Sequence, residues 1–171
     1  MKIFVRFLLM VCFITITFSV PQAGAQSFFD FLTDRNIGKP APDFTLKNLK
    51  GADVNMTKYR DGKKAIIFFW ATWCPHCRAA LKDLNQHRFD IAKKDIKLIL
   101  VDLGEGAAEV TDHMKKHKLD MDVFLDTDNS LAEPYGIVGV PTFCFVNNKG
   151  IVQAVEHSLV KNYEEILSRS K

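Results

Sequence analysis

Two long apolar runs constrain the fold of this chain more than any other feature. Residues 65–70 read AIIFFW, and residues 97–103 read KLILVDL. A strand with one face in water alternates apolar and polar side chains, so runs of this kind predict strands that are buried on both faces. Between the two runs, Leu81, Leu84 and Ile91 fall at helical spacing.

The remaining predicted elements are short and alternate in type. Their pattern predicts an α/β fold in which helices flank a mixed central sheet. A β-hairpin forms an N-terminal extension of this sheet. The elements are a hairpin over 43–56, helices over 107–118, 131–135 and 163–167, a strand over 123–125 and a second hairpin over 142–155.

The first 25 residues have the composition of an export signal. Lys2 and Arg6 precede a stretch without charged residues from 7 to 20, and Ala23-Gly24-Ala25 has the small-x-small form that a signal peptidase accepts. The stretch is shorter than the ~20 apolar residues of a membrane-spanning helix. We therefore predict a cleaved signal peptide over 1–25 and a location in the periplasm or another extracytoplasmic compartment. The alternative is an uncleaved N-terminal anchor.

Length and charge limit the domain count and the partners. The 171 residues leave room for one domain, which we expect over 38–171 after an N-terminal segment over 26–37. The formal net charge of +3 is small, whereas nucleic-acid-binding chains carry a larger basic excess gathered into a stripe. We therefore expect no binding to nucleic acid. We also expect the protein to be a monomer.

The most informative stretch is Trp73-Cys74-Pro75-His76-Cys77, which follows the first apolar run. Two cysteines three residues apart at the start of a helix can form a disulfide with little rearrangement. The helix N-terminus carries partial positive charge and unpaired N–H groups, which stabilise a thiolate at Cys74. Pro75 suits the first helical turn, and a protonated His76 adds positive charge. We therefore expect the pKa of Cys74 to lie below the ordinary value of about 8.5.

These charges predict thiol–disulfide exchange. Cys74 would attack a partner disulfide to form a mixed disulfide, and Cys77 would attack Cys74 to release the partner. The alternatives are a purely structural disulfide and a metal-binding module in which Cys74, Cys77 and His76 hold copper. Zinc is disfavoured because no second Cys/His pair follows at ligand spacing. We expect no metal and no other cofactor.

Three segments carry a resemblance to a known family: Gly38–Leu46, Phe68–Cys77 and Tyr135–Phe143. In this order they resemble the exported TlpA/ResA-like branch of the thioredoxin-fold proteins, and the resemblance covers roughly residues 37–167. It implies a thioredoxin-like fold and the activity of a thiol–disulfide oxidoreductase. Its partners would be exported proteins that contain cysteine.

The resemblance also implies roles for individual residues. Cys74 would be the nucleophile and Cys77 the resolving thiol. Val140 and Pro141 would be joined by a cis peptide bond that faces the pair and presents the Val140 backbone to an extended substrate. Trp73 would shield one side of the disulfide.

The chain departs from the family pattern at two acids. Phe68 stands where thioredoxins carry a buried aspartate, and Ala80 stands where many TlpA/ResA-like proteins carry a glutamate. Either carboxylate would handle the proton of the resolving thiol. Glu105, on the loop after the second apolar run, is a possible substitute as proton acceptor for Cys77; the alternative is an exposed loop acid.

The sequence contains conflicting indications of whether the cysteine pair reduces or oxidises its partners. The Pro-His dipeptide between the cysteines resembles that of the oxidant DsbA. His76 favours the reduced thiolate, and stabilising the reduced form makes the pair a stronger oxidant. TlpA/ResA-like proteins are often reductive and serve cytochrome c or copper-site assembly. We favour reduction, supported by a membrane thiol electron donor. A DsbA-like disulfide donor, which would pass electrons to a membrane acceptor, is the alternative.

Three smaller features complete the sequence predictions. Cys144 lies in an apolar strand and is expected to be a buried, unreactive thiol. His113 and His117 are four residues apart on a predicted helix with neighbouring lysines, and we expect them on a solvated face rather than on a metal. A peroxidase of the peroxiredoxin kind is disfavoured, because the proline and threonine placed ahead of its reactive cysteine are absent here.

Overall fold

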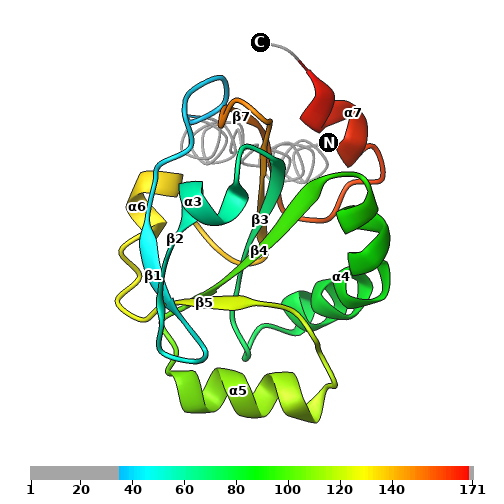
Figure 1. Ribbon diagram of the computed structural model, residues 1–171. Coiled ribbons are helices and arrows are strands. Elements are labelled where there is room, and N and C mark those ends of the chain that lie inside the picture. Colours follow the sequence, from blue (N-terminus) through cyan, green and yellow to red (C-terminus); the bar gives the residue numbers. More distant parts are fainter. Residues whose placement is uncertain (1–34, 170–171) are drawn as a thin grey trace, which may run out of the picture.

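The computed structural model describes residues 35–169, which form a seven-stranded mixed sheet with helices on both faces (Figure 1). The predicted signal peptide and the N-terminal segment up to residue 34 lie outside the described residues. The strands are β1 (Thr45–Asn48), β2 (Asp53–Asn55), β3 (Lys64–Trp70), β4 (Ile96–Leu103), β5 (Val123–Asp126), β6 (Thr142–Val146) and β7 (Val152–Glu156). The helices are α3 (Met56–Arg60), α4 (Pro75–Lys93), α5 (Ala107–Lys116), α6 (Ala132–Tyr135) and α7 (Tyr163–Ser168).

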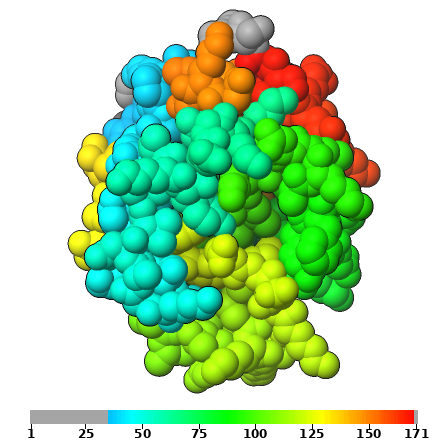
Figure 2. All heavy atoms as spheres, viewed as in Figure 1, coloured from blue at the N-terminus to red at the C-terminus, as the bar shows by residue number. Residues whose placement is uncertain are grey.

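The strand order across the sheet is β2-β1-β5-β4-β3-β6-β7. Strands β3, β4 and β5 are parallel to one another, whereas β6 pairs antiparallel with β3, and the hairpin β1-β2 joins antiparallel to β5. The turn of this hairpin, 48–50, lies beside 120–123, and the two segments line a surface hollow (cyan and yellow-green in Figure 2). The predicted α/β fold, with its mixed sheet and N-terminal hairpin, is confirmed.

Strand β3 lies at the centre of the core, and its residues from Ala65 to Trp70 have no exposed surface. Its even-numbered side chains, Ile66 to Trp70, pack with side chains of α4, α5 and α7. Its odd-numbered side chains, Ala65 to Phe69, pack with those of α3 and α6 on the other face. The uninterrupted apolar run thus predicted the strand correctly, because both faces are covered.

One short helix, α3, was not predicted, and one helix boundary differs from its prediction. Residues 52–56 were expected to be strand, but α3 begins at Met56, because the side chain of Asn55 caps the helix by accepting a hydrogen bond from the N–H of Lys58. Helix α5 ends at Lys116, two residues early. Lys118 adopts a positive φ of 53° there, and the N–H of Leu119 bonds back to Met114.

Three segments meet at the edge of the sheet where the parallel strands end. Strand β3 leads through 71–73 into α4, and β4 ends beside it, because parallel neighbours finish at the same edge. Strand β6 is antiparallel to β3 and therefore begins there, directly after Pro141. None of the helices within residues 35–169 has the length and apolar content that a membrane span requires.

The base of the sheet is tied together by the buried side chain of Arg60. Its Nη1 donates to the carbonyl oxygens of Lys63 at 2.6 Å, Asn148 at 3.0 Å and Asn147 at 3.3 Å. A guanidinium that satisfies several carbonyls at once links α3 to the turn between β6 and β7.

We expect Arg60→Met to lower the free energy of unfolding by about 2–3 kcal/mol, because it leaves buried carbonyl oxygens without a donor. Urea denaturation measures this change. Lys58→Met, on the exposed side of the same helix, is the matched control and should change stability by less than about 0.5 kcal/mol. Equal losses in the two variants would contradict this role of Arg60.

Candidate active site

The two cysteines of the predicted motif form a disulfide at the N-terminus of α4, with Cα atoms 5.2 Å apart. Cys74 is the N-cap residue, and its Sγ accepts a hydrogen bond from the N–H of Cys77 at 3.2 Å. Cys77 is fully buried, whereas Cys74 is 4% exposed. Cys74 is therefore the sulfur that a partner can reach, and it lies where unpaired N–H groups and the helix dipole favour negative charge.

The loop before β6 lies against this pair. The Val140–Pro141 peptide bond is cis, as predicted, and the carbonyl oxygen of Val140 lies 3.6 Å from Cys74 Sγ. The hydroxyl of Thr142 donates to the carbonyl of Gly139 at 2.7 Å, and His157 Nδ1 lies 3.0 Å from the carbonyl oxygen of Pro141. These contacts fix the backbone of the loop beside the reactive sulfur.

The surface around the pair is apolar and accessible. Trp73, directly before the first cysteine, is 67% exposed, and Val138 is 43% exposed. A groove of about 530 Å³ borders the site and is lined by side chains that include His76, Pro141 and Leu159. Exposed aromatic and aliphatic groups beside a groove are typical of a surface that binds another chain.

Glu105, the predicted proton acceptor, is hydrogen-bonded to the loop that leads to Cys74. It is buried, and its carboxylate accepts hydrogen bonds of 2.5 Å from both the N–H and the hydroxyl of Thr72, two residues before Cys74. Burial alone would raise the pKa of Glu105, but these hydrogen bonds outweigh it and lower the pKa. Glu105 is thus an ionised acid tied to the active-site loop, not an exposed one.

Asp102 is an acid that the sequence analysis missed. It is fully buried, and neither of its carboxylate oxygens has a hydrogen-bond partner within the described residues. It pairs in register with Trp70, and alternation along β4 places it on the sheet face that packs against α4. Burial, reinforced by the negative charge of Glu105, raises the pKa of Asp102 to about 8. Asp102 is therefore protonated at neutral pH.

The two positions where related proteins carry acids are apolar in the structure. Phe68 is fully buried and stacks on Phe143, with ring centroids 4.4 Å apart. Ala80 lies on α4 against the same core. Two acids lie where β4 ends instead: Asp102, in register with Trp70, and Glu105, hydrogen-bonded to Thr72. The sequence signal was an aspartate inside the apolar run KLILVDL.

The structure also tests the predictions for Cys144 and His113. Cys144 is buried on the opposite face of the sheet from Cys77, and burial raises its pKa to about 12. The prediction of a solvated face was wrong for His113, whose ring packs 5.6 Å from that of Trp70. Within residues 35–169, no three His, Cys, Asp or Glu side chains are arranged to hold a metal ion.

The thioredoxin-like fold, the disulfide at a helix N-terminus and the cis-proline opposite it define a thiol–disulfide oxidoreductase. The chain belongs to the AhpC/TSA family, whose model matches residues 37–155.

Relatives of known class agree with this assignment. The chain is similar to thiol-disulfide oxidoreductase ResA of Geobacillus thermodenitrificans, with 28% identity over 135 residues that cover 77% of each chain. It is 32% identical over 114 residues to sporulation thiol-disulfide oxidoreductase A of Bacillus subtilis, which covers 64% of this chain and 67% of the relative. A solved thiol:disulfide interchange protein of Chlorobium tepidum superposes with a TM-score of 0.64 at 26% identity, covering 75% of this chain and 92% of that one.

The raised pKa of Asp102 predicts a pH-dependent loss of stability. The folded protein keeps a proton on Asp102 up to pH about 8, whereas the unfolded chain releases it near pH 3.9. The free energy of unfolding therefore falls as pH rises between these values. The side chain in Asp102→Asn carries no charge at either pH. Between pH 5 and pH 8.5 we therefore expect the free energy of unfolding of wild type to fall by at least about 1.4 kcal/mol more than that of Asp102→Asn.

Chemical denaturation of both proteins at the two pH values measures this difference. Asp112→Asn, which removes an exposed acid on α5, is the control and should leave the pH dependence unchanged. Parallel pH curves for wild type and Asp102→Asn would show that Asp102 titrates normally.

Proposed function

We propose that this thiol–disulfide oxidoreductase reduces disulfides in exported, cysteine-containing proteins, with Cys74 as nucleophile and Cys77 as resolving thiol. The observation that carries the proposal is the position of Cys74: an N-cap residue that is 4% exposed, whereas Cys77 is fully buried, beside the cis-proline loop. The support for export is the sequence of residues 1–25, with its basic start and uncharged run.

The proposed reaction has two exchange steps. The Cys74 thiolate attacks one sulfur of the partner disulfide, which breaks that bond and releases the other partner sulfur as a thiolate that takes up a proton. Cys77 then loses its proton and attacks Cys74, which releases the second partner thiol and leaves a Cys74–Cys77 disulfide. Two electrons and two protons pass to the partner. A membrane thiol donor would return the pair to the reduced state.

The surroundings of the pair suit each step. Pro75 begins the helix whose N–H groups face Cys74, and His76 stands exposed at the rim, where its protonated form adds positive charge near the sulfur. An extended partner segment would lie along the loop at Val140 and Pro141. The exposed ring of Trp73 would cover its apolar side chains and exclude water from the exchanging sulfurs.

For the proton of Cys77 we propose the two acids at the end of β4. Glu105 is ionised and can accept the proton when Cys77 attacks. Asp102 is protonated at neutral pH and can return a proton when the pair is reduced again. The low pKa of one acid and the high pKa of the other thus divide the two tasks between them.

The proposed substrates are apoproteins whose cysteines must be reduced before they take up haem or copper. This choice follows the resemblance to the TlpA/ResA-like branch. The Pro-His dipeptide at 75–76 favours the reverse direction, in which the pair donates its disulfide.

Cysteine variants test the two roles. We expect Cys74→Ser to abolish the reduction of insulin disulfides, because no accessible thiolate remains. Cys77→Ser should still attack but lack the resolving step, so it should accumulate a mixed disulfide that appears on a non-reducing gel. Cys144→Ser, buried on the other face, is the control and should keep activity within about twofold of wild type. Equal activity in all three variants would refute the proposal.

The redox state of the pair in cells tests the direction. We expect thiol alkylation of intact cells to trap Cys74 and Cys77 mostly as dithiol, because a reductase must be kept reduced by its electron donor. A mostly oxidised pair would instead identify a disulfide donor. Alkylation of Cys144→Ser cells separates the signal of the pair from that of the third thiol.

A further inference from the structure

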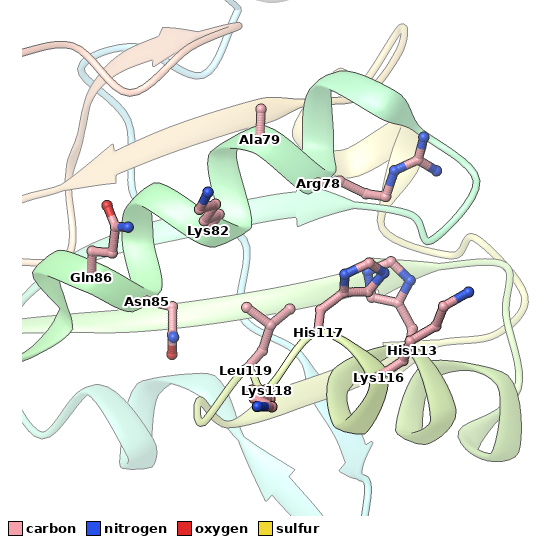
Figure 3. A pocket seen from close by; sticks show the side chains of 10 residues that line it. All are labelled: Arg78, Ala79, Lys82, Asn85, Gln86, His113, Lys116, His117, Lys118 and Leu119. Carbon is pink, nitrogen blue, oxygen red and sulfur yellow. The ribbon is translucent and has the colours of Figure 1, made fainter.

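A second cavity, of about 620 Å³, lies between α4 and α5. Figure 3 shows Arg78 and Lys82 on α4 on one side of it, and the rings of His113 and His117 with Lys116 on the other. We call it the basic groove and define it by its charged and titratable lining residues: Arg78, Lys82, Lys116, Lys118, His113 and His117. No aspartate or glutamate is among the residues that line it.

Within residues 35–169, none of the four cations of the basic groove forms an ion pair with an acid. The ion pairs that lysine and arginine form within residues 35–169 involve other side chains. One example is Arg88, in the C-terminal half of α4, which lies 3.6 Å from Asp120. The formal charge of the whole chain is only +3. The groove therefore gathers positive charges that no ion pair within residues 35–169 offsets.

The pKa of His113, which lines the groove, responds to these positive charges. Its Nε2 is buried and has no hydrogen-bond partner in the described part of the chain. Burial lowers the pKa of His113, and the positive charges of His117, Arg78 and Lys116 lower it further, while Glu105 acts in the opposite sense. An anion in the groove would offset the effect of those cations on the pKa of His113.

One end of the basic groove is lined by Arg78, in the first turn of α4, which also carries Cys77. Arg78 follows Cys77 directly, and its Nη1 donates to the carbonyl oxygen of Thr72 at 3.3 Å. From there the groove runs along α4, on the side of the helix that carries Arg78, Lys82 and Asn85, whereas the groove at Pro141 borders its other side. A chain bound at Cys74 can therefore extend from the exposed Trp73 into the basic groove.

We propose that the basic groove binds an acidic segment of the partner protein, a run of aspartate and glutamate side chains close to the cysteine that reacts with Cys74. This inference rests on the proposed function and adds the chemistry by which the partner is selected. Carboxylates near uncompensated lysines and arginines speed encounter and hold the partner in register. Salt weakens both effects, because exposed charges are screened within about 8 Å at physiological ionic strength.

The test compares two peptides with the same intramolecular disulfide, one flanked by several glutamates and the other by glutamines. Reduced protein is mixed with each peptide, and the rate of mixed-disulfide formation is followed by stopped-flow fluorescence. At low salt we expect the acidic peptide to react about tenfold faster. At 1 M salt, where the screening length is about 3 Å, the preference should fall below about twofold.

Matched variants assign the preference to the groove. Lys82→Gln with Lys116→Gln should remove the preference and leave the rate with the neutral peptide unchanged. Lys50→Gln with Lys149→Gln removes the same charge from exposed lysines outside the groove and should keep the preference. A preference that survives in the groove variant, or that is lost equally in both, would overturn the inference. Failure of wild type to react with either peptide would instead refute the proposed function.

Binding without chemistry gives a second measurement. NMR titration of oxidised protein with an acidic peptide that lacks cysteine should raise the pKa of His113, because a negative charge then occupies the groove. The glutamine peptide should cause no shift. If inorganic phosphate at the same concentration raises the pKa of His113 as much as the acidic peptide does, the groove is a general anion site and the assignment to a partner segment is wrong.

Discussion

The burial of β3 on both faces is the constraint on which the active site depends. A strand paired with β4 on one side and β6 on the other, with helices over both faces, cannot shift its register without exposing a whole row of apolar side chains. Its last residue, Trp70, is therefore fixed, and so is the short segment that leads to Cys74. The position of one sulfur thus follows from the packing of an entire strand.

Much of this arrangement was accessible from the sequence because it depends on local pattern. The apolar run at 65–70 and the helical spacing after Cys77 predict the strand, the helix and the N-terminal position of the cysteines. The cis bond before Pro141 was accessible only through family resemblance, since trans is the commoner form of such bonds. The start of α3 was missed, because one side chain, that of Asn55, decides it by capping.

The acids of the site were harder to predict because their chemistry depends on tertiary burial. Nothing in the run KLILVDL distinguishes an aspartate at the exposed end of a strand from one under a helix. Asp102 is buried because α4 and α5 pack over the end of β4, and it keeps its proton because burial disfavours the charged form and Glu105 adds a negative charge. His113 was mispredicted for the same reason, since its helix turns it toward Trp70.

Glu105 and the cations of the basic groove shift the pKa of His113 in opposite directions. Glu105 raises the pKa of this imidazole, while Arg78, Lys116 and His117 lower it. A negative segment bound in the groove would offset those cations and so favour a proton on His113. Since coupling between binding and protonation is reciprocal, a proton on His113 would in turn strengthen the binding of the acidic segment. The charge that speeds the arrival of the partner would therefore also hold it more tightly at a pH at which His113 is protonated.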